Sequence, residues 1–193
     1  LGSGGLPVVC VASGRPRIAL GAPLPAGSSA DGEILEFWLT EVRPAWIVRE
    51  ALAPRLPRGH RTVGLESVWL GAPARSGQIA AADYEVTMRA AERDRADVDN
   101  AARRLLARDR LLRQRQKGGE TRTYDLRALV VSLEATRVAG EGVALHMRTL
   151  IHPELGTGRP DEVVAALSDE AGTPLRIEGI VRRRLLLADD LEG

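Results

Sequence analysis

Alternating apolar and polar residues predict short strands in the first part of the chain. Residues 17–24 and residues 33–40 each carry an apolar side chain at every second position, and residues 25–32 between them are rich in turn-forming residues. This pattern of period two predicts a β-hairpin. A proline opens a predicted helix at residues 44–54, and residues 62–70 form a predicted closing strand.

The rest of the chain predicts a fuller set of elements, after a loop at residues 71–77. Alternation predicts strands at residues 84–89, 129–134, 143–148 and 175–187, with a turn at residues 139–142. One predicted helix has Asp94 as its N-cap and the buried stripe Val98, Ala101, Ala102 and Leu105. A second begins at Pro160, has the buried stripe Val163, Val164 and Leu167, and ends at Gly172.

The predicted order of elements indicates the class of fold. In residues 76–193 the order is β-α-β-β-α-β, which is that of a ferredoxin-like unit. Residues 1–75 have the same β-β-α-β tail but lack the opening strand and helix. We therefore expect an α+β fold of two tandem ferredoxin-like units, the first (residues 1–75) incomplete and the second (residues 76–193) complete. This expectation depends on the order of elements, not on a repeat of individual residues.

Composition narrows the classes of protein without naming one. The 193 residues contain 27 cations and 26 acids, so the net charge of +1 says nothing about a partner, and only a local cluster can. Cys10 is the only cysteine and the three histidines are scattered, so we expect no metal site, no iron–sulfur cluster and no cofactor. No signal peptide or long apolar run is present, which predicts a cytoplasmic protein without membrane contact.

Residues 108–127 hold a dense cluster of charge, with seven cations against three acids. The candidate phosphate contacts within this segment are Arg113, Arg115, Lys117, Arg122 and Arg127. The first three alternate with glutamines, so a strand here carries them on one face, and a two-glycine turn follows. Such a face can neutralise phosphates, and the neighbouring Tyr124 can stack on a base. The alternative is a solvated edge strand whose charges prevent edge-to-edge pairing.

Further candidates are weaker. Arg15 and Arg17 flank a proline that stiffens the backbone, and Arg159 precedes a predicted helix, whose first N–H groups attract anions. Asp125 lies between two arginines, which favour the ionised carboxylate and make it a candidate catalytic nucleophile or base. The alternative is that Asp125 only orients the arginines. Residues 182–184 are three consecutive arginines, expected to be solvated or to extend the basic surface.

The order of several short motifs resembles one known family. The motifs are Gly5-Leu6-Pro7, Arg15-Pro16-Arg17-Ile18, Pro23-Leu24-Pro25-Ala26-Gly27, the strand at residues 33–39, Lys117, Asp125-Leu126-Arg127 and Arg159-Pro160-Asp161. Together they resemble the uncharacterised bacterial radical-SAM-linked protein family, whose members are encoded beside, or fused to, a radical SAM protein. The resemblance implies a radical SAM partner, and a strand and helix before the Gly-Leu-Pro motif. The family's Gly-Phe-Asn-Pro-like stretch is replaced here by residues 9–14.

These observations lead to an expected function. A radical SAM cluster normally needs three cysteines and this chain has one, so the chain is not itself that enzyme. We expect an accessory module that presents a structured RNA, such as tRNA or rRNA, to the radical SAM partner. The five candidate cations within residues 108–127 would contact phosphates, with Arg15, Arg17 and Arg159. Two alternatives stay open: a protein–protein adaptor that binds no RNA, and an RNA-modifying enzyme resembling pseudouridine synthases, with Asp125 as its catalytic residue.

Overall fold

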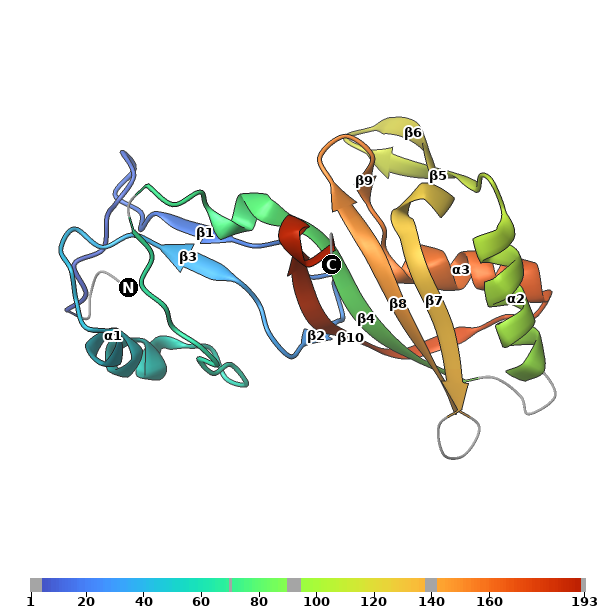
Figure 1. Ribbon diagram of the computed structural model, residues 1–193, viewed down its shortest axis with the longest axis horizontal. Coiled ribbons are helices and arrows are strands. Elements are labelled where there is room, and N and C mark those ends of the chain that lie inside the picture. Colours follow the sequence, from blue (N-terminus) through green and yellow to red (C-terminus); the bar gives the residue numbers. More distant parts are fainter. Residues whose placement is uncertain (1–4, 70, 90–94, 138–141, 192–193) are drawn as a thin grey trace. The chain divides into compact units, whose positions relative to one another are not determined.

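The chain folds into two compact units, each with its own sheet (Figure 1). The structure, a computed structural model, describes residues 5–69, 71–89, 95–137 and 142–191. Unit 1 contains residues 1–22 and 33–78, and unit 2 contains residues 23–32 and 79–193.

Unit 2 is built on four long antiparallel strands. They are β4 (Ile79–Arg89), β7 (Val130–Arg137), β8 (Gly142–His152) and β10 (Arg176–Leu187), in the order β10-β4-β8-β7. Helix α2 (Arg95–Ala107) follows β4 in sequence, and helix α3 (Pro160–Ala171) lies between β8 and β10. The β-α-β-β-α-β order expected for the second half is therefore present, and the mixed α+β class is confirmed.

The predicted apolar faces form the core of unit 2. All residues of the predicted helix stripes are buried, namely Val98, Ala101, Ala102, Leu105, Val163, Val164 and Leu167. The sheet contributes the predicted alternate positions Tyr84, Val86, Met88, Val143, Leu145 and Met147, which are buried as well. Burying a side chain of the size of Val, Leu or Met is worth roughly 1.5–3 kcal/mol, so this core accounts for much of the stability of unit 2.

Helix α3 begins and ends where the sequence indicates. Pro160 lies in its first turn, and Gly172 has a left-handed φ of 68° at its C-cap. The backbone before the helix passes close to the sheet. A Cβ at Gly158 would lie 2.8 Å from the Cβ of Thr149, whose buried hydroxyl donates to the Gly158 carbonyl at 2.8 Å. The predicted N-cap of α2, Asp94, lies outside the described residues.

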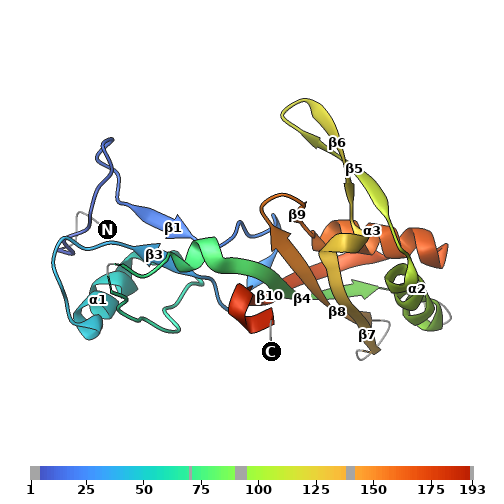
Figure 2. The ribbon, with the colours of Figure 1, turned by 45° about the horizontal axis from the view of Figure 1, so that its top comes forward.

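A hairpin is inserted between α2 and β7. Its strands β5 (Leu112–Lys117) and β6 (Glu120–Asp125) pair with each other in a separate two-stranded sheet. Gly118 and Gly119 form the turn with φ values of 61° and 86°, which a type I′ turn requires and which glycine adopts without strain. The strand and the two-glycine turn predicted here are confirmed. Figure 2 shows the hairpin projecting from the rest of unit 2. The 3-10 turn η5 (Arg127–Leu129) then leads into β7.

Residues 23–32 join the sheet of unit 2, although the sequence analysis placed them in the first half as a turn. Strand β2 (Ser29–Ala30) pairs in parallel with β10, opposite Val181 and Arg182. Arg182 is fully buried, and its guanidinium donates to the Pro23 carbonyl at 3.2 Å. The expectation that these arginines are solvated is therefore wrong for Arg182. The backbone of β10 pairs with β2 at this position, and the Arg182 guanidinium binds the Pro23 carbonyl.

Unit 1 has shorter elements. Strands β1 (Ile18–Leu20) and β3 (Leu35–Phe37) form the predicted antiparallel pair, with fewer residues than the alternation suggested. Helix α1 (Ala45–Leu52) follows Pro44 and continues into the 3-10 turn η2 (Ala53–Arg55). A further 3-10 turn, η3 (Arg75–Gln78), precedes β4. Val48 is the one buried residue of α1.

The closing strand predicted for unit 1 does not form. Residues 62–69 have no regular secondary structure, and residue 70 lies outside the described residues. An alternating segment becomes a strand only when a neighbouring strand takes up its backbone hydrogen bonds, and β1 and β3 pair with each other. Among the described residues, unit 1 holds one two-stranded sheet and one α-helix, so the expected duplication of ferredoxin-like units is not confirmed.

Candidate anion-binding site

The β5–β6 hairpin carries its cations on one face. Its register sets Arg113 opposite Tyr124, Arg115 opposite Arg122, and Lys117 opposite Glu120. Side chains of directly opposed residues lie on the same side of an antiparallel pair, so these residues share a face. The side chain of Lys117 itself lies outside the described part of the structure.

Two arginines of this face are bound by acidic residues of α3. Arg115 binds the Glu162 carboxylate through two nitrogens, with Nε–Oε1 and Nη2–Oε2 distances of 2.9 and 2.5 Å. Arg113 donates to Asp169 at 2.7 Å. The hydroxyl of Tyr124 also donates to Glu162, and the Arg115 guanidinium lies 4.9 Å from the centre of the Tyr124 ring. These contacts hold the hairpin against α3.

The charge state of this cluster is stable around neutral pH. Burial by itself would raise the pKa of Glu162, but hydrogen bonds from Arg115 and Tyr124 outweigh it, and the pKa lies below its ordinary value. Burial, and then the hydrogen bond to Glu162, raise the pKa of Tyr124 to about 12. Arg115, bonded to Glu162, has a raised pKa. The cluster is thus a carboxylate held by a cation and a neutral phenol, which suits an anchor and not acid–base chemistry.

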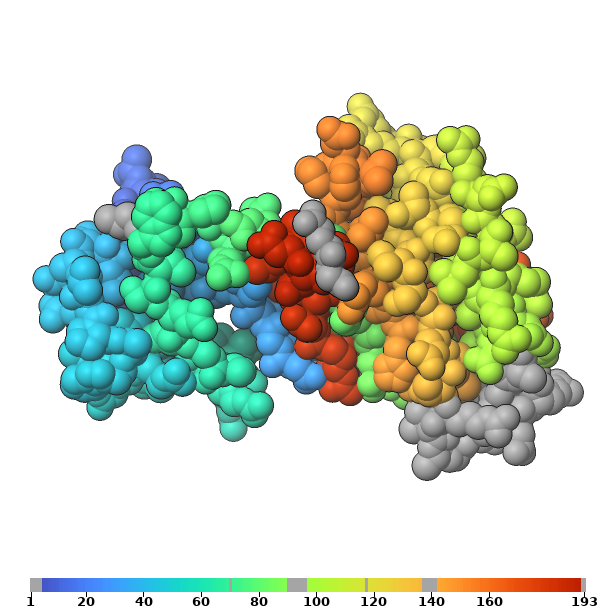
Figure 3. Space-filling view, in the orientation of Figure 1, coloured from blue at the N-terminus to red at the C-terminus, as the bar shows by residue number. Residues whose placement is uncertain are grey.

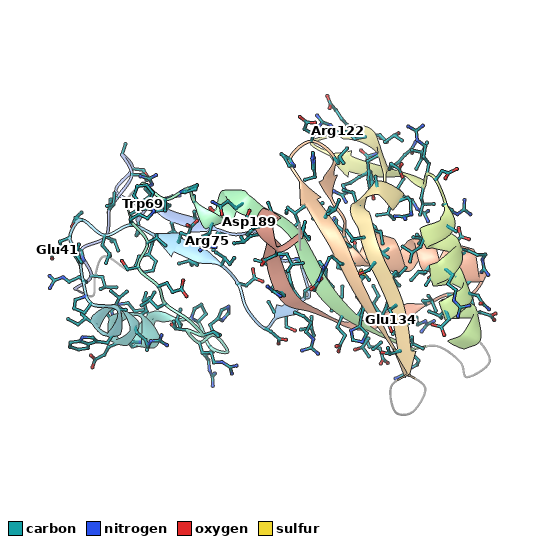
Figure 4. The ribbon with its side chains drawn as sticks, in the orientation of Figure 1. Glu41, Trp69, Arg75, Arg122, Glu134 and Asp189 are labelled. Atoms are coloured by element: carbon teal, nitrogen blue, oxygen red, sulfur yellow. The ribbon has the colours of Figure 1, made fainter. Side chains whose placement is uncertain are left out.

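Arg122 differs from its neighbours on the same hairpin. Its side chain is 67% exposed, and its contact with the exposed Glu120 has an N–O distance of 3.6 Å. An exposed ion pair of this kind contributes little to stability, so the guanidinium can exchange its partner at small cost. Figure 4 shows Arg122 on the outer part of the hairpin, and Figure 3 shows the hairpin and α2 at the surface of unit 2.

Asp125 and Arg127 close the base of the hairpin. Asp125 Oδ1 accepts hydrogen bonds from the backbone N–H groups of Leu111 at 2.9 Å and Arg127 at 3.0 Å. The Arg127 guanidinium donates to the carbonyl groups of Leu106 and Val130. Within the described contacts, neither Arg122 nor Arg127 binds the Asp125 carboxylate through its guanidinium. Both residues of the predicted site therefore act here in stabilising a turn.

Arg159 occupies the N-cap position of α3. Its guanidinium binds Asp161 through two nitrogens at 3.2 and 3.1 Å. Asp161 and Glu162 lie in the first helical turn, where negative side chains favour the positive end of the helix dipole. The helix start that was expected to attract an external anion thus carries acidic groups of its own.

Arg15 and Arg17 lie in unit 1, on the segment that follows a tight turn at residues 11–14. The Val11 N–H donates to the Arg15 carbonyl and the Arg17 N–H to the Val9 carbonyl, both at 2.8 Å. The Arg17 guanidinium lies 4.2 Å from the centre of the Trp38 ring, a cation–π contact. Arg15 is exposed, and none of its side-chain atoms binds another described residue.

The predicted site residues therefore fall into two groups. Unit 2 holds Arg113, Arg115, Lys117, Arg122, Arg127 and Arg159, on the hairpin, on η5 and at the start of α3, and unit 1 holds Arg15 and Arg17. Sequence reasoning missed the acids that bind the first group, Glu162 and Asp169. Their spacing of seven residues places them on one face of α3, two turns apart, but nothing local indicates that this face meets the hairpin.

The sheet of unit 2 has a second set of compensated cations, on β8 and β10. Arg148 binds Asp83 through two nitrogens at 2.7 and 3.0 Å. Arg183 bridges Asp31 at 2.8 Å and Glu85 at 3.0 Å. Searched over the described residues, the structure shows no group of three His, Cys, Asp or Glu side chains that could hold a metal ion, and no helix long and apolar enough to cross a membrane.

Comparison with known proteins identifies the family. A family model described as "Uncharacterized protein conserved in bacteria (DUF2344)" matches residues 13–163, so the chain belongs to this bacterial family. No match was found among curated proteins. One solved structure with detectable similarity is titled "Crystal Structure of a Cbf5-Nop10-Gar1 Complex". The identity is 12%, the TM-score is 0.37, and the match covers 56% of this chain and 31% of that chain.

Proposed function

We propose that this protein is a non-catalytic accessory module that presents structured RNA to a radical SAM partner. The observation that carries the proposal is the pair of arginines in unit 1. Arg15 is exposed and lacks a described partner, and the Arg17 guanidinium lies 4.2 Å from the centre of the Trp38 ring. Exposed guanidinium groups bind phosphates, and arginine and aromatic planes also stack on unpaired RNA bases. Arg122 on the hairpin, exposed and weakly paired, is the strongest additional candidate.

The other arginines predicted to contact RNA are already bound by groups of the protein itself. A phosphate would reach Arg113 or Arg115 only by displacing the carboxylates of Asp169 or Glu162. Arg127 and Arg159 are likewise engaged, by backbone carbonyl groups and by Asp161. We therefore assign these four arginines to shaping the surface, and Arg15, Arg17 and Arg122 to direct contact with RNA.

Binding to bulk tRNA at two salt concentrations tests the proposal. Phosphate binding predicts an affinity that falls steeply with salt, by roughly one power of the salt concentration for each phosphate neutralised. The double variant Arg15→Gln/Arg17→Gln should bind more weakly and with a shallower salt slope. The matched control is Arg184→Gln, which replaces an exposed arginine of unit 2 that contacts Asp190 at 3.5 Å. The proposal fails if the unchanged protein does not bind tRNA at low salt, or if test variant and control bind equally.

A protein–protein adaptor for the radical SAM partner is a second candidate, favoured by a different observation. Unit 1 exposes large apolar side chains, including Leu20 at 69%, Trp46 at 66% and Trp69 at 74%. Exposed apolar side chains mark an interaction site where they form one contiguous patch. Co-purification of the radical SAM protein that survives nuclease treatment and high salt would support the adaptor. Loss of the complex after nuclease treatment would show that RNA holds it together and would favour the RNA-binding module.

No observation in the described residues favours the third alternative, a pseudouridine-synthase-like enzyme. Both described partners of the Asp125 carboxylate are backbone N–H groups. Asp125→Asn keeps an acceptor oxygen for those groups but removes the carboxylate that a nucleophile needs. If this variant restores the full RNA modification profile of a deletion strain, Asp125 is not catalytic. A folded variant that restores none of it would revive the enzymatic alternative.

A further inference from the structure

Backbone hydrogen bonds tie Arg17 and Trp38 together at one end of the β1–β3 pair. Arg17 precedes β1 and Trp38 follows β3, so the register that pairs Ile18 with Phe37 sets these two residues opposite each other, one position further along. Val9 caps this end of the pair. Its N–H donates to the Trp38 carbonyl, and its carbonyl accepts from the Arg17 N–H, both at 2.8 Å. The backbone that carries both side chains is thus preformed without a ligand.

The Arg17 side chain is supported on one side and open on the other. Its guanidinium lies over the Trp38 ring, 4.2 Å from the ring centre. Arg17 is exposed, and Trp38 is half-buried. A guanidinium group is a flat cation that stacks on rings and binds oxygen atoms through its N–H edge. Because no other described residue binds the Arg17 guanidinium, its side away from the indole is open to a ligand.

Arg15 supplies a second cation beside this pair. Pro16, between the two arginines, forms an antiparallel bridge with Cys10. The residue before a proline favours extended backbone, and residues two positions apart in such backbone project to the same side. Arg15 is therefore placed to bind a charged group of the same ligand whose flat part meets Arg17.

The acidic residue on this side of β3 is already engaged. Glu36 lies two positions before Trp38, and its two carboxylate oxygens accept hydrogen bonds from the backbone N–H groups of Arg75 and Ser76 at 2.8 and 2.9 Å. Its carboxylate thus stabilises a turn of unit 1, and within the described contacts it binds neither Arg15 nor Arg17. The two guanidinium groups keep their capacity for an anionic ligand.

An unpaired nucleotide has both properties that this arrangement complements. Its base offers a flat π-face for the guanidinium, and its phosphate offers a negative charge for a neighbouring arginine. A base inside a duplex is covered on both faces by its neighbours, so a duplex can offer only phosphates. A phosphate by itself would use the charge of the two arginines and leave the stacking surface unused.

We propose that Arg15, Arg17 and Trp38 form a binding site for one unpaired nucleotide of an RNA chain. The base stacks on the Arg17 guanidinium, and Arg15 binds a phosphate. Trp38 is a positioning residue that supports the guanidinium from the other side. The proposal rests on the RNA-binding function proposed above and names the part of the RNA that unit 1 recognises, a loop or a single-stranded end and not a helix.

Two substitutions that keep the charge test this site. Arg17→Lys keeps the cation but removes the flat group, and Arg15→Lys is the matched control, because lysine still binds a phosphate. Both positions are exposed, so both variants should fold, which thermal unfolding checks. The probes are a labelled oligoadenylate and an RNA duplex of the same length, each measured across a salt series.

The two variants should separate on the single-stranded probe alone. We expect Arg17→Lys to bind the oligoadenylate about 10-fold more weakly, because the stacking of one base is lost. Its affinity for the duplex and its salt slopes should stay those of the unchanged protein, because the number of cations is the same. Arg15→Lys should bind both probes within about two-fold of the unchanged protein.

Tryptophan fluorescence gives a second readout of the same site. Trp46→Phe/Trp69→Phe changes two positions that are 66% and 74% exposed and leaves Trp38 as the only tryptophan of the chain. Saturating oligoadenylate should quench the Trp38 emission of this variant, because the bound base lies beside the Arg17–Trp38 pair, and the duplex should not. Adding Arg17→Lys should remove the quenching.

The outcomes distinguish failure of the site from failure of the RNA-binding function. An unchanged protein that binds neither tRNA nor either probe at low salt removes both proposals. If the protein binds tRNA, but Arg17→Lys and Arg15→Lys bind the oligoadenylate equally well, the nucleotide site is overturned and RNA binding through phosphates stands. A loss of affinity in Arg17→Lys without quenching of Trp38 in the single-tryptophan protein would place the base elsewhere and overturn the site as well.

Discussion

The hairpin of unit 2 and the Arg15–Arg17 segment of unit 1 carry the same local pattern and have different environments. In both, arginines occupy alternate positions of the chain. On the hairpin, the carboxylates of α3 bind Arg113 and Arg115. On the Arg15–Arg17 segment, neither arginine has an acidic partner among the described residues, and the Arg17 guanidinium contacts the Trp38 indole. Alternation in the sequence therefore predicts which side chains share a face of a strand. Whether those cations stabilise the fold or stay available to a ligand depends on the element that packs against that face.

Replacing Arg182 should have the largest effect among the arginines. Its guanidinium is fully buried and binds the Pro23 carbonyl. Arg182→Leu leaves that carbonyl without its partner and loosens residues 23–32, and we expect unfolding free energy to fall by about 3 kcal/mol. Urea denaturation measures the change. The control is Arg184→Leu, two residues further along β10, with an effect of about 0.5 kcal/mol or less. Similar losses in both would contradict the structural role of Arg182.

Removal of the unit 1 arginines should have the largest effect on RNA binding. Losing two phosphate contacts in Arg15→Gln/Arg17→Gln predicts an affinity for tRNA about 10- to 100-fold lower at low salt and a salt slope smaller by about 2. Filter binding across a salt series measures both quantities. Arg113→Gln should change the affinity by much less, because Asp169 already occupies its guanidinium. The reverse ranking of the two variants would place the RNA site on the hairpin.

A double-mutant cycle on Arg115 and Glu162 isolates the contact that holds the hairpin to α3. We expect a coupling of about 1 kcal/mol from Arg115→Ala and Glu162→Ala, because both groups are partly buried and the bond is bidentate. The exposed pair Arg122 and Glu120 should show coupling near zero. Equal couplings for the two pairs would contradict the division of the hairpin into an anchored and an available part.

Acid should weaken one carboxylate contact in each unit, and we expect this effect to be smaller than those of the three sets of substitutions above. Burial raises the pKa of Glu162 and of Glu36, but their hydrogen bonds outweigh it, and both values lie below the ordinary 4.5. The stabilisation is therefore complete above pH 4.5 and is lost as the pH falls through the folded-state values. Protection factors of the hairpin amides in hydrogen–deuterium exchange, which correct for the intrinsic effect of pH on exchange, should fall below pH 4.5. In Glu162→Gln, the hairpin should lose this acid-dependent fall in protection, while the segment around Glu36 keeps it.

Much of unit 2 was predictable because its elements have strong local signals. Alternation across residues 84–89 and 143–148, the stripe of α2 and the proline and glycine at the ends of α3 all correspond to observed elements. Unit 1 was less predictable. Residues 62–69 alternate like a strand but pair with no strand among the described residues, and the apolar side chains Ile18, Leu20 and Leu35 of β1 and β3 are exposed. Amphipathic pattern predicts a buried face only when the chain supplies something to cover it.

The candidate site was predicted in part. The shared face of Arg113 and Arg115 follows from a strand's period of two, and the register confirms it. The acids that bind these arginines were not predicted, since Arg115 and Glu162 are 47 residues apart in sequence. Burial of Arg182 was missed for a similar reason, because its partner carbonyl belongs to residues 23–32, 159 positions away.

The sequence by itself determined the elements of unit 2, the side of each strand that carries charge, and the glycine turn of the hairpin, because hydrophobic period and backbone dihedral preferences act between near neighbours. Only the tertiary structure decided which arginines are paired with acids, which segment pairs with the edge of β10, and that Ile18, Leu20 and Leu35 are exposed. These properties depend on groups brought together from distant parts of the chain, where desolvation and the presence of a partner set the energy of each charge and of each apolar face.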